Sequence, residues 1–219
     1  MSSLIRWRFV VMAGAVAALA WAGLDLYGPR SHDLRDFQPD EVGRLETAMW
    51  RSYYKKADLR LFGQLATLLR EQYDLPALRS YLVAFHAARA AALFQRGHNR
   101  SEYERALPDL QDFYSAIAKV AVQRFDVQRA ARLELEWWII HRERASHAAG
   151  DLTRSLAELQ AEFYHVTPAT LLDHAGERAS AMLLRDVKAE NGDLGPDDWR
   201  QIELKLKNSW TLLWKSVRY

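Results

Sequence analysis

The sequence predicts an all-α protein in which one apolar N-terminal segment, a transmembrane helix or signal peptide, precedes a bundle of about seven helices. Two observations predict this class. Apolar residues recur at helical spacing along nearly the whole chain after residue 40, and no segment shows the strict alternation of a half-buried strand. Because the connections between these segments are short, we expect neighbouring helices to pack roughly antiparallel.

Length and composition indicate one globular domain and exclude several classes of function. The chain has 219 residues, of which 49% are apolar and 26% are charged, so a packed core is expected. Arg6 and Arg8 are the only ionisable side chains before Asp25, and beyond them acidic and basic residues balance. A neutral body has no field that attracts phosphate backbones, so we expect no nucleic-acid partner. The absence of Cys excludes disulfides, thiolate nucleophiles, sulfur-ligated zinc and iron–sulfur clusters.

Residues 1–27 are predicted to be a membrane anchor or signal segment. An uncharged run, residues 9–24, follows the two arginines and ends at Asp25. As a helix it would span about 24 Å, slightly less than the roughly 30 Å hydrocarbon layer. Trp7 and Tyr27 flank the run and could lie at the two interfaces. We therefore expect membrane lipid to contact residues 9–27.

The charges around this segment predict its direction. Arg6 and Arg8 precede it, whereas acids outnumber bases in residues 25–41, so the positive-inside rule keeps the N-terminus cytoplasmic. The body then lies on the periplasmic, or extracytoplasmic, side. A cleaved signal peptide is the alternative, because Ala18-Leu19-Ala20 and Ala20-Trp21-Ala22 fit the small-x-small rule, and it delivers the body to the same side. A buried core helix is a third alternative, but it leaves the flanking charges unexplained.

We expect residues 28–39 to form a linker and residues 40–219 the helical domain. The stretch DLRDFQP before residue 40 is polar and ends in proline. Helix boundaries are indicated by Asp126 as an N-cap, Gly150 as a turn and Pro196 in a first turn. A possible break near Asp58 leaves open whether the first stripe belongs to one helix or two. The last stripe predicts that the C-terminal helix belongs to the core: Trp199, Ile202, Leu206, Trp210 and Leu213.

Glu134 and His141 are the candidate metal ligands. They are seven residues apart, so about two turns return them to nearly the same angle on one helix face. That face also carries Trp138 and is otherwise apolar, and an ionised Glu there must be paired, protonated or bound to metal. Carboxylates and imidazoles from facing helices hold iron or manganese in helical bundles. The alternative is an aromatic core in which Glu134 pairs with Arg51 or Arg178.

Other features weaken the metalloenzyme hypothesis. A ferritin-like site needs two E-x-x-H helices, and only Glu162 and His165 have that spacing, on a face expected to be exposed. Glu46, which lies beside the apolar stripe of the first helix after the linker, is a further candidate, as are His174 and Glu177, which have the reversed H-x-x-E spacing. Motifs of nucleotide-binding and serine enzymes are absent, so we assign no catalytic residue and no cofactor.

The favoured hypothesis is a membrane-tethered interaction or accessory subunit of a larger membrane-associated assembly. Trp50, Tyr53 and Tyr54 place three aromatic side chains on two faces of the first helix after the linker. Aromatic residues beside arginine are typical of protein interfaces, so we expect a protein partner. A carboxylate and histidine metalloenzyme is the alternative.

Overall fold

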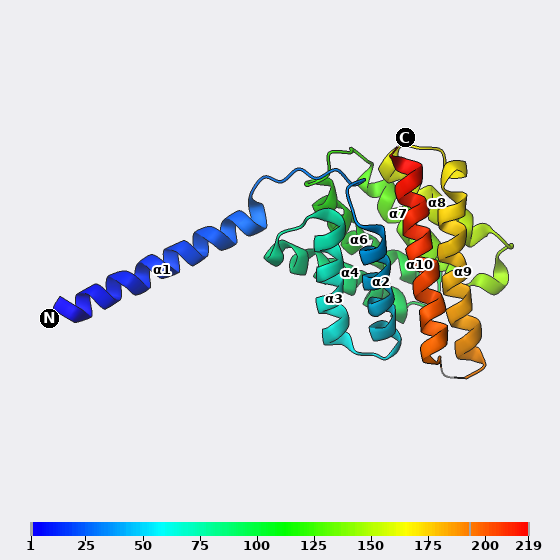
Figure 1. Cartoon of the computed structure of the whole chain (residues 1–219), viewed down its shortest axis with the longest axis horizontal. Helices are drawn as coiled ribbons and strands as arrows, with labels where there is room; N and C mark the ends of the chain where they lie inside the picture. Colours follow the sequence, from blue (N-terminus) through cyan, green and yellow to red (C-terminus); the bar gives the residue numbers. More distant parts are fainter. Residues whose placement is uncertain (1, 193, 219) are drawn as a thin grey trace.

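The computed structural model describes residues 2–192 and 194–218, with side chains from Trp7 onward, and within these ranges it contains helices and no β-strand (Figure 1). The predicted all-α class is therefore confirmed. Helix α1 (Ser2–Tyr27) projects away from a body made of the remaining helices. These are α2 (Pro39–Tyr54), α3 (Asp58–Tyr73), α4 (Ala77–Arg96), α5 (Arg100–Tyr103), α6 (Leu107–Ala118), α7 (Val127–Arg142), α8 (Asp151–Tyr164), α9 (Leu172–Glu190) and α10 (Pro196–Val217).

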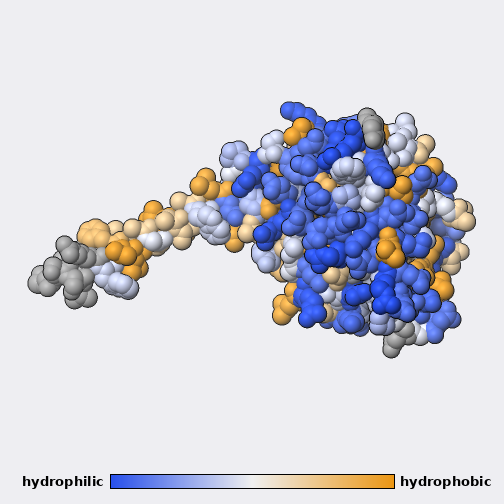
Figure 2. All heavy atoms as spheres, in the orientation of Figure 1, coloured by the Kyte–Doolittle hydropathy of each residue, from blue (hydrophilic) through white to orange (hydrophobic). Residues whose placement is uncertain are grey.

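Helix α1 is long and apolar enough to cross a membrane. Its segment Trp7–Tyr27 has 21 residues and a mean hydropathy of 1.9, and none of the span is buried against the body. Figure 2 shows this helix as an apolar arm beside a largely hydrophilic body. Length and composition therefore support a membrane anchor or a signal sequence, as expected.

The segment between α1 and α2 is packed onto the body. Leu34 and Phe37 are 2% and 3% exposed, although the stretch around them is polar. The backbone N–H of Leu34 donates to Gln123 Oε1 at 2.9 Å, and its carbonyl accepts from the Tyr164 hydroxyl at 3.0 Å. Residues 28–38 lie between α1 and α2, and these bonds hold part of this segment against the body.

Local signals fix most helix ends. Asp126 caps α7, because its side chain accepts hydrogen bonds from the backbone of Gln128 and Arg129. Pro196 begins α10, and Gly150 precedes α8 with a φ of 94°, a conformation that favours glycine. The open question about the first stripe is answered by a break after Tyr54, which makes α2 and α3 separate helices.

Helix α10 lies in the core, between α2 and α9 (Figure 1). The predicted stripe is buried along its whole length: Trp199, Ile202, Leu206, Trp210 and Leu213. The remaining helices complete the body through the neighbouring pairs α3 and α4, α4 and α6, α6 and α7, and α7 and α8. The C-terminal helix is therefore part of the core.

The close approach of α2 to α10 requires glycine at position 43. A Cβ atom there would lie 2.8 Å from the Cα of Lys207. We predict that Gly43→Ala lowers the free energy of unfolding by about 1–3 kcal/mol, because backbone must move to admit the methyl group. Gly63→Ala is the matched control: a Cβ at this interior position of α3 meets nothing within 4 Å. It should raise stability by about 0.5–1 kcal/mol.

Chemical denaturation of both variants measures these changes. Equal effects of the two substitutions would contradict the close approach of α2 and α10.

Candidate functional site

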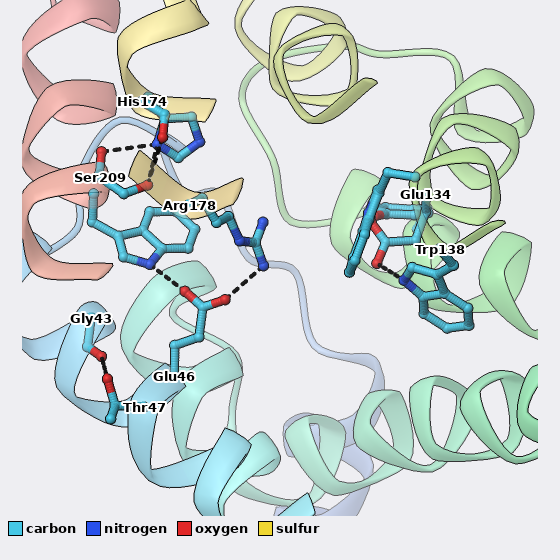
Figure 3. Close-up of polar contacts among 11 residues, drawn as sticks. Gly43, Glu46, Thr47, Glu134, Trp138, His174, Arg178 and Ser209 are labelled. Carbon is cyan, nitrogen blue, oxygen red and sulfur yellow. Dashed lines mark hydrogen bonds and ion pairs between the residues drawn. The ribbon is translucent and has the colours of Figure 1, made fainter. Parts of the chain in front are cut away.

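A buried ion pair joins α2 to α9 at the centre of the body (Figure 3). Glu46 is 1% exposed, and its Oε1 lies 2.7 Å from Arg178 Nη2. The other carboxylate oxygen accepts a hydrogen bond from Trp210 Nε1 of α10 at 2.6 Å. Both oxygens of a buried carboxylate are thus satisfied, one by a cation and one by an indole.

Arg178 lies between two indole rings. Its Cζ is 5.7 Å from the ring centroid of Trp137 and 5.8 Å from that of Trp210, within the range of cation–π attraction. Burial alone would lower the pKa of Arg178, but Glu46 and Glu134 outweigh burial and raise that pKa. The guanidinium therefore stays charged inside the protein.

Glu134 is held by three neutral donors. Its Oε2 accepts from the Tyr114 hydroxyl at 2.8 Å and from Trp137 Nε1 at 2.9 Å, and its Oε1 accepts from Trp138 Nε1 at 2.9 Å. Burial first, and then the charge of Glu134, raise the pKa of Tyr114 well above its usual value. Tyr114 therefore keeps its hydroxyl proton and remains a hydrogen-bond donor to this carboxylate.

His141 has a different partner. Its Nε2 lies 3.0 Å from Asp186 Oδ2 on α9, and Arg144 and Arg185 flank the same carboxylate at 3.3 and 3.0 Å. Burial would raise the pKa of Asp186, but the hydrogen bonds from His141 and Arg185 lower it overall. The structure thus places Glu134 and His141 on one helix without bringing them to a common partner. Metal binding by this pair stays a prediction that no shared geometry supports.

The remaining predicted candidates also have separate surroundings. Glu162 accepts from the backbone of Asp126 and pairs with Arg129 at 2.9 Å, while His165 Nε2 lies 2.5 Å from the carbonyl of Arg124. His174 is 1% exposed, and its Nδ1 donates to the Ser209 carbonyl at 2.9 Å. Burial lowers the pKa of His174 to about 4, so this imidazole is neutral near pH 7.

Sequence reasoning missed a second group of ligand-type side chains. His86 of α4 faces Asp109 and Asp112 of α6, and one ligand atom from each lies within 4.8 Å of the other two. His86 is 23 residues from Asp109 in the sequence and lies on a different helix, so no local motif links them. The only local signal was the three-residue spacing of the aspartates, which is also typical of acids in a first helical turn.

Helix α1 is fixed to the body by reciprocal capping with α4. Asp25 Oδ1 accepts hydrogen bonds from the backbone N–H groups of Leu78 and Arg79, at 2.8 and 3.1 Å, in the first turn of α4. In return, Arg79 Nε donates to the Asp25 carbonyl at 3.2 Å, and its Nη2 donates to the Gly28 carbonyl at 2.8 Å.

The signs of these contacts agree with the dipoles of both helices. A carboxylate lies at the N-terminus of α4 and a guanidinium at the C-terminus of α1, each of which is favourable. Arg79 is 8% exposed, so these bonds are partly shielded from water. The junction therefore sets the direction in which α1 leaves the body.

Two of the three aromatic side chains of α2 pack against the core. Trp50 and Tyr54 pack around Trp199, and Arg185 lies over the Tyr54 ring, whereas Tyr53 stays 40% exposed. Large exposed apolar side chains lie instead on α4, at Tyr81, Leu82 and Phe85. A further apolar groove runs along α9, lined by residues that include Thr153, Gly176, Leu183, Leu184, Val187 and Lys205.

Comparison with protein-family models, with curated proteins and with solved structures finds no match for this chain. Three features of the molecule bear on its function. These are the exposed apolar helix, its fixed junction with α4, and a buried polar centre whose carboxylates are already satisfied.

We predict that Arg178→Met lowers the free energy of unfolding by about 3–5 kcal/mol, because it leaves Glu46 charged and buried. The double variant Glu46→Gln/Arg178→Met should recover most of that loss, since glutamine keeps an acceptor for Trp210 without a charge. Arg44→Met is the matched control from the exposed pair Arg44–Glu41 on the same helix. It should change stability by less than about 1 kcal/mol.

Urea denaturation of the natural sequence and of the three variants measures these changes in the free energy of unfolding. A loss in Arg178→Met no larger than that in Arg44→Met would show that the buried pair contributes little.

Proposed function

We propose that this chain is a membrane-tethered helical accessory protein, in which α1 spans the bilayer and the body binds a protein partner of a membrane-associated assembly. The observation that carries the proposal is the exposure of α1 together with its fixed end. Large apolar side chains are more than half exposed along α1, among them Trp7, Phe9, Met12, Val16, Leu19 and Leu24. Leaving such side chains in water costs about 1.5–3 kcal/mol each, and a lipid environment removes that cost.

The position of the apolar side chains on α4 supports the same arrangement. Tyr81 and Leu82 follow the docking residues Leu78 and Arg79 by about one helical turn, and Phe85 by about two. They are 45–48% exposed, beside the end of the proposed span. Aromatic side chains are favoured at the level of lipid headgroups. This side of α4 is therefore suited to the membrane surface.

The polar centre supports a role in binding rather than catalysis. Glu46 is 1% exposed and bonded through both oxygens within the core, and Glu134 accepts from three donors. Groups held in this way stabilise a helix arrangement instead of meeting a substrate. The groove along α9 is a separate apolar surface, and we assign it to the protein partner. Helix α9 lies on the side of the body away from α1 (Figure 1).

The positive-inside rule assigns the sides of the membrane in this proposal. Arg6 and Arg8 stay in the cytoplasm, and the body lies on the extracytoplasmic side.

Single introduced cysteines test the anchor and its direction, because the natural sequence has no Cys. Leu59 is 91% exposed on the body, and Ser3 precedes the span. In spheroplasts that express the full chain, we predict that a membrane-impermeant maleimide labels Leu59→Cys in intact cells. Ser3→Cys should be labelled only after lysis, and both proteins should remain in the membrane pellet after an alkaline wash.

Two results would contradict this arrangement. A Ser3→Cys chain without any thiol in the mature protein, even after lysis, would show that the segment is cleaved. Labelling of Leu59→Cys only after lysis would place the body in the cytoplasm.

A charge in the α9 groove tests the accessory role. We predict that a protein co-purifies in a fixed ratio with the tagged full chain from native membranes, and that Leu183→Glu abolishes this association, because a carboxylate in an apolar contact is desolvated without a partner. Leu59→Glu is the matched control, an exposed leucine outside the groove. Loss of the partner in both variants, or in neither, would overturn the assignment of the groove.

A further inference from the structure

His86, Asp109 and Asp112 form a compact set of electron-pair donors between α4 and α6, which are neighbouring helices. His86 Nδ1 lies 3.5 Å from Asp109 Oδ1 and 3.7 Å from Asp112 Oδ2. The two aspartates are three residues apart on α6, so they project from the same side of that helix. The three donor atoms lie within 4.8 Å of one another.

One of these side chains, His86, lacks a hydrogen bond that burial normally requires. His86 Nδ1 is shielded from solvent and has no hydrogen-bond partner among the described residues. The Asp109 side chain is 4% exposed, and its nearest cation, Arg89 Nε, is 3.3 Å away. Buried polar groups are almost always hydrogen-bonded, so the unpartnered His86 Nδ1 beside this carboxylate is suited to a further ligand.

The separations match coordination better than direct hydrogen bonding. A metal ion held at about 2.0–2.1 Å places tetrahedral ligand atoms about 3.3–3.5 Å apart. Octahedral neighbours at the same bond length would be about 2.8–3.0 Å apart. The observed 3.5 and 3.7 Å exceed hydrogen-bond distances and lie near the tetrahedral value. A small contraction would close the set around an ion.

We propose that His86, Asp109 and Asp112 bind one Zn²⁺ ion, with the fourth tetrahedral position open to water. An imidazole with two carboxylates is a ligand set that zinc accepts, whereas Mg²⁺ and Ca²⁺ prefer oxygen ligands alone. The two aspartates supply two negative charges against the two positive charges of the ion. Asp112 has a 64% exposed side chain, so solvent reaches the open position.

Arg89 does not block the site. Its side chain is 56% exposed, and its Cζ already lies 5.7 Å from the Phe85 ring centroid. When the ion neutralises Asp109, the Arg89 guanidinium can stay over the Phe85 ring and direct its N–H groups toward water. The ion would then join α6 to α4, the helix whose first turn holds α1. This inference does not depend on the proposed partner or on the direction of the anchor.

Titration of the purified full chain in detergent with ZnCl₂, followed by calorimetry, tests the site. We expect one Zn²⁺ per chain, and a weakening of the affinity by at least roughly 10-fold in both His86→Gln and Asp112→Asn. His98→Gln is the matched control, since His98 is 86% exposed and faces a single carboxylate, Glu102, at 3.5 Å. Its affinity should equal that of the natural sequence.

Co²⁺ provides an independent readout because tetrahedral coordination gives it strong visible absorption. We expect this absorption in the natural sequence and in His98→Gln, and its loss in Asp112→Asn. The Asp112 side chain is 64% exposed, so its substitution leaves the packing of the core unchanged. Absence of Zn²⁺ binding would overturn the proposal. An equal loss of affinity in His98→Gln and His86→Gln would also overturn it, because it would indicate only weak binding to surface histidines.

Discussion

Burying Glu46 and Arg178 removes two charges from water, and the arrangement of the body depends on their staying together. An unpaired charge in this position costs several kcal/mol, so any displacement of α2 relative to α9 is strongly penalised. Trp210 bonds the same carboxylate and extends the constraint to α10, and Trp137 adds α7 through its contact with Arg178. One polar contact thereby fixes the relative positions of helices from both ends of the sequence.

Indole N–H groups satisfy two carboxylates of the body, the buried Glu46 and the partly buried Glu134. Trp210 donates to Glu46, and Trp137 and Trp138 donate to Glu134. An indole is a donor without an acceptor site, so it suits a carboxylate, which only accepts. It also fills space as a large apolar group. The richness in tryptophan that the sequence shows thus reflects, in part, the need to satisfy acids inside the core.

The sequence was sufficient for the fold class and for many helix ends, because those depend on local signals. The stripe on α10, the cap at Asp126 and the start at Pro196 each depend on neighbours within a few residues. Glu134 and His141 show where such reasoning stops. Seven residues return a side chain to the same angle but also move it about 10.5 Å along the axis. Glu134 therefore bonds to Tyr114 of α6, while His141 reaches Asp186 of α9.

Contacts between distant segments could not be predicted from spacing at all. Glu46 stood out as a polar residue beside an apolar stripe, but its partner is 132 residues away. Leu34 and Phe37 lie in a stretch whose composition is polar, and only the surrounding helices reveal that they are buried. His86 and the two aspartates likewise meet only because α4 packs against α6.

The reciprocal caps between α1 and α4 have a mechanical consequence. Helix α1 has 26 residues and is therefore a rod about 39 Å long, held at its end by four hydrogen bonds. A span adapts to bilayer thickness by tilting. With a rigid joint, every degree of tilt of α1 rotates the whole body by the same angle. In a membrane, lipid thickness would then set which face of the body points away from the bilayer, and the chain would convert a property of the lipid into an orientation.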